Sequence, residues 1–103
     1  MINQLATFQL FFGRHIANLN REVSDSSWDQ FVSDTIDPLF DGYTIQTAKG
    51  VWHGQSETTM IVSICCSDSL WTRELIQDIT KAYKTRFHQD SVGLLILPPI
   101  SFL

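Results

Sequence analysis

The sequence predicts a two-layer α+β fold in which two helices cover one face of a four-stranded sheet. Two observations lead to this prediction. Apolar residues alternate with a period of two in several short segments, and they recur every three or four residues in two longer ones. A chain of 103 residues, 44% of them hydrophobic, has the length and composition of one such domain, spanning residues 1–103.

The first strand and the first helix are marked by the residues at their ends. Apolar and polar residues alternate over residues 5–14, and Gly13 closes the strand, after which a polar loop is expected. Ser24 is a suitable helix N-cap, and an apolar stripe follows it. Because Pro38 disfavours helical geometry at Asp37, we expect the helix to end there.

A β-hairpin is expected next. Residues 43–53 and residues 58–66 both read as strands, with apolar side chains aligned on one face of each. The segment from Gly54 to Glu57 is expected to connect them.

The second helix should begin at Asp68 or Ser69 and run to about Phe87. Its apolar stripe is predicted to comprise Trp71, Leu75, Ile76, Ile79, Ala82, Tyr83 and Arg86. A near-continuous apolar run, residues 92–97, then supplies the last strand before two prolines.

This order of elements is most simply a ferredoxin-like sandwich (βαββαβ), with an antiparallel four-stranded sheet and both helices on one face. Its first and third strands would be antiparallel neighbours. The open face must be solvated, covered by a partner or used for binding. Phe11 and the last strand supply more apolar residues than one buried face needs, which favours a homodimer or a ligand groove.

Composition narrows the classes of partner. A net charge of −4 and a pI of about 5.1 argue against nucleic acid, whose phosphates favour a basic surface. The two cysteines, Cys65 and Cys66, are adjacent, so on a strand they point to opposite faces and are expected to stay reduced. No stretch reaches the roughly 18 apolar residues of a membrane span, and no signal-peptide pattern opens the chain. We therefore expect a cytoplasmic protein without membrane contact.

The hairpin contains the first candidate site residue, Trp52. It could be a packing residue near the end of the hairpin. Alternatively, it could form a stacking wall for a ligand, with His53 or Glu57 at the polar rim.

Three charged residues form a second candidate group. In the predicted fold the end of the first strand, at Arg14, lies beside the start of the third strand, near Glu57. The two side chains could form a surface ion pair or face a shared pocket. Arg86, with Gln89 nearby, lies at the end of the second helix, where cations are favoured by the helix dipole.

Motifs for known chemistry are missing from the sequence. The three histidines, at positions 15, 53 and 88, have no metal-ligand spacing, so neither a metal nor another cofactor is expected. There is no phosphate-binding loop and no nucleophile elbow, and the sequence indicates no catalytic residue.

The residues "VSDSSWDQF", "DGYTIQTAKGVW" and "YKTRFHQDSV", together with Gly13 and Glu57, resemble the bacterial domain of unknown function 3574 family. That family's outline is a glycine after the first strand, then VSxxxWxxF, FPDGxTxxxxxGxW, a charged residue and YxxxFxQxSV. The resemblance covers nearly the whole chain and implies a fold and a site location, but no reaction. It adds weight to Trp52, Glu57 and Gln89.

Two functions follow from these observations. The main prediction is a small non-catalytic binding or regulatory module that contacts a protein or a small metabolite, as a homodimer. The alternative is a small enzyme or metabolite-handling domain in which Arg14, Glu57 and Arg86 surround an anionic substrate. The predicted binding residues are Arg14, Trp52, Glu57, Arg86 and Gln89.

Overall fold

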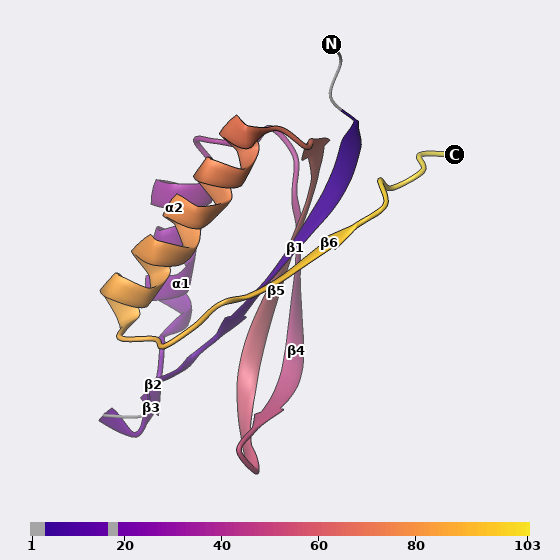
Figure 1. Cartoon of the computed structure of the whole chain (residues 1–103). Helices are drawn as coiled ribbons and strands as arrows, with labels where there is room; N and C mark the ends of the chain where they lie inside the picture. Colours follow the sequence, from indigo (N-terminus) through magenta and orange to yellow (C-terminus); the bar gives the residue numbers. More distant parts are fainter. Residues whose placement is uncertain (1–3, 17–18) are drawn as a thin grey trace.

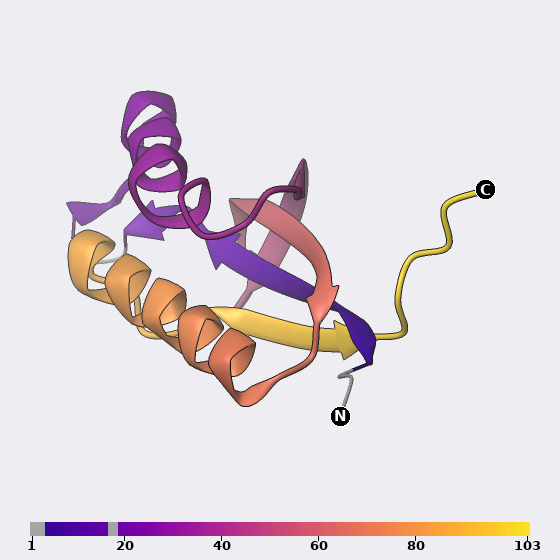
Figure 2. The same ribbon diagram turned by 90° about the horizontal axis from the view of Figure 1, so that it is seen from above.

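The structure is a computed structural model and describes residues 4–16 and 19–103. Its main sheet has the order β4-β5-β1-β6, and all neighbouring strands are antiparallel. The elements of this layer are β1 (Leu5–Gly13), β4 (Thr44–Trp52), β5 (Gln55–Ser67) and β6 (Gly93–Leu97). Two helices, α1 (Asp25–Phe31) and α2 (Leu70–Phe87), lie on one side of the sheet (Figures 1 and 2). The predicted α+β architecture, with a four-stranded antiparallel sheet and two helices, is confirmed.

The core lies between the helices and β1. Phe8, Leu10 and Phe12 are fully buried, as their alternation predicts. Phe12 contacts Trp28 of α1 and Tyr83 of α2, with ring centroids 5.3 and 4.8 Å apart. Tilted and edge-on aromatic pairs of this kind each add about 0.5–1.5 kcal/mol beyond the area that they bury.

The first helix begins as predicted. The Ser24 hydroxyl accepts a hydrogen bond from the backbone N–H of Ser27 at 3.1 Å, which caps α1. The helix then widens into a π-helical segment, η2 (Val32–Ile36), which ends at Asp37, before Pro38.

The polar loop expected after β1 is in part a second, small sheet. Two short strands, β2 (His15–Ile16) and β3 (Arg21–Glu22), pair antiparallel. The backbone N–H of Val23 donates to the carbonyl of Arg14 at 2.7 Å and extends this pairing. Residues 17 and 18 of the expected loop lie outside the described residues.

The hairpin turn is shorter than predicted. His53 and Gly54 alone connect β4 to β5, with φ angles of 50° and 76°. Two positive φ values are typical of a tight hairpin turn, whose twist matches that of the strands. Glu57 is therefore not part of the connection but a residue of β5, directly opposite Gly50.

Ser69, one of the two predicted starting residues, caps α2, and the buried residues of α2 include Thr72, Ile76, Ile79 and Tyr83. The predicted stripe is wrong at Trp71, which is 70% exposed, and at Arg86, which is also exposed. Thr72 takes the inward position because the spacing of four, three and four residues from it to Tyr83 follows one face of the helix.

The molecule is elongated, with a longest dimension of 48 Å and the others of 24 and 21 Å. The tip of the β4–β5 hairpin and the C-terminal segment extend from opposite ends of the sheet (Figure 1). In the described residues, no helix is long and apolar enough to cross a membrane.

Candidate functional site

A cleft of about 800 Å³ lies at one end of the sheet. Its floor is part of the open face of the sheet, the face away from the helices. Alternate residues of a strand point to opposite faces, so Phe11 and Gly13 point to the open face because Phe12 points into the core. The floor residues are Phe11, Gly13, Gly50, Thr59, Ile61 and Gly93. The hairpin tip and residues 88–92, which connect α2 to β6, also line it. A volume of this size suits a small-molecule ligand.

Gly13 makes room for the carboxylate of Glu57 on this floor. A Cβ atom at Gly13 would lie 2.7 and 2.8 Å from the two carboxylate oxygens of Glu57. A Cβ atom at Gly50, which faces Glu57 across the hairpin, would lie 3.7 Å from its Cγ and would clash with Thr59. The side chain of Glu57 can therefore lie along the sheet, above Gly13.

The Glu57 carboxylate is held from the end of β1. Its Oε2 accepts a hydrogen bond from the backbone N–H of His15 at 3.2 Å, and the residue is only partly buried. Asp90 also lines the cleft, and among the lining residues that the structure describes Lys49 is the one Lys or Arg, beside three histidines. Because Gly50 lies on the cleft face, the side chain of Lys49 points to the other face of the sheet. The charged side chains at the cleft are thus mainly acidic.

Tyr83 supports the floor from the core side. Its hydroxyl donates to the carbonyl of Gly13 at 2.7 Å. Burial raises the pKa of the Tyr83 phenol; the charge of Arg14 opposes this shift, and that of Glu57 adds to it. At neutral pH the hydroxyl therefore stays protonated and keeps the end of β1 in place.

Gln89 joins the cleft to the end of α2. Its side-chain amide donates to the carbonyl of His15 at 2.8 Å. The helix ends at His88, which has a left-handed conformation with φ of 53°, and the backbone N–H of Gln89 donates to the carbonyl of Lys84. These backbone contacts at the end of α2 fix the position of the Gln89 backbone, and thus of the atom from which its side chain extends.

Trp52 lies at the hairpin tip, where 67% of its surface is exposed, and it lines the cleft. Its ring meets the imidazole of His53 edge-on, with centroids 4.9 Å apart. Trp52 is therefore not a core residue, and its ring is accessible to a ligand.

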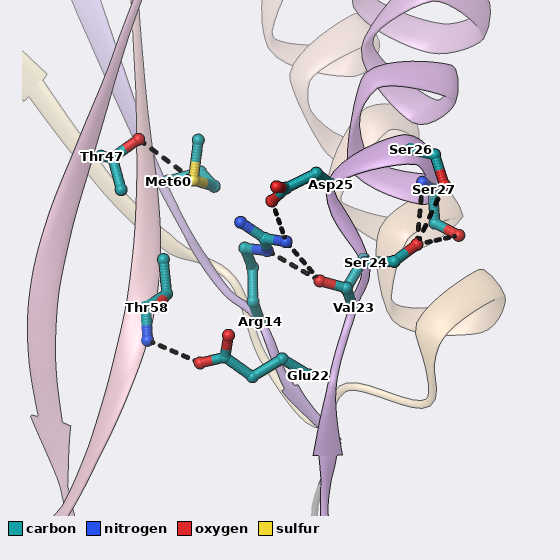
Figure 3. A network of polar contacts seen from close by, with 10 residues as sticks. All are labelled: Arg14, Glu22, Val23, Ser24, Asp25, Ser26, Ser27, Thr47, Thr58 and Met60. Carbon is teal, nitrogen blue, oxygen red and sulfur yellow. Dashed lines mark hydrogen bonds and ion pairs between the residues drawn. The ribbon is translucent and has the colours of Figure 1, made fainter.

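Arg14 does not line the cleft. Its side chain is buried, and its Nε donates to the carbonyl of Val23 at 2.9 Å (Figure 3). One terminal nitrogen contacts Asp25 at 2.7 Å. Arg14 therefore joins the end of β1 to the start of α1, and its ion-pair partner is Asp25 rather than Glu57.

Arg86 also lies away from the cleft. It is an exposed residue of α2, paired with Asp34 at 3.3 Å and placed over the ring of Phe87 at 5.5 Å. Of the five predicted residues, the structure brings Trp52, Glu57 and Gln89 together and leaves Arg14 and Arg86 outside. Their roles in binding stay predictions.

Sequence reasoning missed part of this cleft. The sequence offered no reason to group the three histidines, whereas in the structure His15, His53 and His88 all line the cleft. They come from three distant segments, so no spacing could have joined them. Within residues 4–16 and 19–103, no group of three His, Cys, Asp or Glu residues is placed to hold a metal ion. The expectation that neither a metal nor another cofactor takes part remains a prediction.

The sequence matches the family described as "Protein of unknown function (DUF3574)" over residues 7–100. The chain belongs to this family. The resemblance seen in the sequence is thus confirmed. A comparison with curated proteins gave no match for this DUF3574 member.

Two solved structures are similar to this DUF3574 domain. One is a phage SAM lyase in complex with S-methyl-5′-thioadenosine; it has a TM-score of 0.64 and 14% sequence identity, over 93% of this chain and 82% of that one. The other is a phage SAM lyase in the apo state, with a TM-score of 0.58 and 17% identity, over 98% of this chain and 94% of that one. At such identities the likeness shows a shared fold.

These neighbours overturn the main functional prediction. A non-catalytic binding or regulatory module was expected because no catalytic motif is visible, but both similar structures are those of an enzyme. The prediction fails because an active site can be assembled from scattered residues without a sequence motif. The alternative, a small enzyme or metabolite-handling domain, agrees better with this finding.

Proposed function

We propose that this chain is a small enzyme or metabolite-handling domain that binds its substrate in the cleft around Glu57. The observation that carries the proposal is the position of the Glu57 carboxylate. It lies over Gly13 on the floor of a cleft of about 800 Å³. The likeness of the fold to phage SAM lyase supports an enzyme. A ferredoxin-like topology is part of this proposal, and the strand order β4-β5-β1-β6 supports it.

The substrate charge that we propose differs from the sequence-based expectation. An anionic metabolite was expected because Arg14 and Arg86 were placed beside Glu57. Both arginines are engaged outside the cleft, whereas Glu57 and Asp90 line it. An acidic cleft favours a cationic ligand because opposite charges attract more strongly in a partly desolvated site.

We therefore propose an adenosine that carries a sulfonium group, such as SAM, as the substrate class. The phage enzyme is described as a SAM lyase and was solved with S-methyl-5′-thioadenosine. The sulfonium charge would lie near Glu57, and the exposed ring of Trp52 offers a stacking surface for a purine. Lyase cleavage of the bond between sulfur and the amino-acid side chain would leave its electron pair on sulfur and give the neutral thioether. The substrate's own carboxylate would form the new bond to the carbon that sulfur leaves, so the second product would be a lactone.

The test is incubation of the purified protein with SAM, with mass spectrometry to detect S-methyl-5′-thioadenosine. We expect thioether formation by the wild type, and a rate lower by at least about tenfold in Glu57→Gln, because about 1.4 kcal/mol of charge interaction is lost. Glu74→Gln is the matched control, since Glu74 is exposed on α2. If the wild type neither consumes SAM nor binds the thioether, the proposal is wrong.

Trp52 gives a second readout of the same proposal. Its exposed ring should change fluorescence when a ligand stacks on it, whereas Trp28 is buried in the core. Trp52→Phe should remove the ligand-dependent signal, and Trp71→Phe, which changes an exposed ring of α2, should keep it. A cytoplasmic location remains part of the proposal, and the two free cysteines support it.

A further inference from the structure

The backbone of His15 is held on both sides by side chains from distant segments. Its N–H donates to Glu57 of β5 at 3.2 Å, and its carbonyl accepts from Gln89 at 2.8 Å. These partners are 42 and 74 residues away along the chain. His15 is thus the point at which the cleft carboxylate meets the end of α2.

The N–H and the carbonyl of His15 are free to bind side chains because neither is used in strand pairing. The Val23 N–H donates to the carbonyl of Arg14, and the carbonyl of Val23 accepts from the Arg14 side chain. The next pair along, His15 with Glu22, is then a non-hydrogen-bonded pair, in which the backbone groups point outward. On the other side, β1 pairs with β5 only as far as the bond from the Arg14 N–H to the carbonyl of Thr58.

We propose that Gln89 is a positioning residue for Glu57. By binding the carbonyl of His15, it fixes the residue whose N–H holds the carboxylate on the cleft floor. This inference rests on the proposed function for the role of Glu57, and it adds a residue that acts through another rather than on the substrate. The helix end supplies the rigid anchor, since the backbone N–H of Gln89 is bonded to the carbonyl of Lys84 at 3.0 Å.

A positioning role differs from a merely structural one in a measurable way. If Gln89 acts through Glu57, its loss harms ligand binding only while the Glu57 charge is present. The effects of Gln89→Leu and Glu57→Gln on affinity should then be non-additive, as they are for residues that act as one unit. If Gln89 only stabilises the fold, or contacts the ligand by itself, the two effects should add.

The experiment is a double-mutant cycle that measures the affinity for S-methyl-5′-thioadenosine by calorimetry and the KM for SAM by initial-rate kinetics. We expect Gln89→Leu to weaken SAM binding about fivefold in the wild type and to have little effect in Glu57→Gln. Gln77→Leu is the matched control, because it makes the same change on the exposed face of α2. Additive effects would overturn the proposal.

Hydrogen exchange of the His15 amide, followed by NMR, tests the chain of contacts without any ligand. Gln89→Leu should speed exchange at His15 more than at the neighbouring strand amides, and unchanged exchange would overturn the proposal. If Gln89→Leu does not fold, Gln89→Glu keeps the size of the side chain and removes the amide donor. If the wild type binds neither nucleoside, the proposed function fails, while the exchange measurement still decides the role of Gln89.

Discussion

Gly13 lies directly beneath the carboxylate of Glu57, so close that a Cβ atom at this position would be 2.7 Å from Oε1. The residue opposite Gly13 in β5 is Thr59, and Glu57 is the next residue of β5 on the same face. The missing side chain of one strand thus provides the space for the acidic side chain of the next.

Gly13→Ala should displace the Glu57 carboxylate and weaken SAM binding by about tenfold, because the charge moves away from the His15 N–H. The fold should persist, since the clash is with the end of a flexible side chain. Initial-rate kinetics with SAM measure the effect as a change in KM. Gly42→Ala is the control, as a Cβ there meets nothing within 4 Å. Equal affinities for the two variants would show that the position of Glu57 does not matter.

Arg14 should matter for stability and Arg86 should not. Arg14→Met leaves the carbonyl of Val23 without its side-chain donor in a buried site, and we expect a loss of about 2–3 kcal/mol in the free energy of unfolding. Arg86→Met removes an exposed ion pair worth about 0–1 kcal/mol. Urea denaturation of both variants checks this, and a larger loss for Arg86 would contradict the structure.

The pH dependence of stability should reflect Tyr83. Burial raises its pKa in the folded state, so its contribution is fully present below the unfolded value of about 10 and is lost as pH rises through the folded pKa. We expect Tm to fall above about pH 10 in the wild type and to fall less in Tyr83→Phe.

Tyr43 provides the control for this measurement. Its pKa is also raised, first by its hydrogen bond to Asp37, but it is an exposed contact. Tyr43→Phe should therefore retain most of the alkaline loss. If Tyr83→Phe kept the same pH profile as the wild type, the phenol would not be the group responsible.

We expect the protein to form a homodimer through the exposed apolar strand β6. Leu94, Leu95, Ile96 and Leu97 are all between 37% and 48% exposed, and β6 is an edge strand of the sheet. Exposed apolar edges of this kind favour association with another chain. Light scattering should give twice the chain mass, and Leu95→Lys should give a monomer, while Leu39→Lys should not. A wild-type monomer would exclude this assembly.

The sequence predicted the elements well where local chemistry decides them. The caps at Ser24 and Ser69, the helix end before Pro38 and the buried face of β1 were all readable, because capping and period-two alternation act over a few residues. It misplaced Trp71 and the hairpin turn. Both errors are shifts of one to three residues. Packing against the sheet determines which residue of a helix points inward, and the twist of the strands determines the length of the hairpin turn.

By itself, the sequence determined the α+β architecture and supplied five candidate binding residues, three of which, Trp52, Glu57 and Gln89, line one cleft. Only the tertiary structure decided which charges meet. Arg14 lies one residue beyond Gly13, and its side chain enters the core side of the sheet, where it finds Val23 and Asp25 instead of Glu57. The face to which a side chain points depends on the strand register, and register depends on contacts between residues far apart in the sequence.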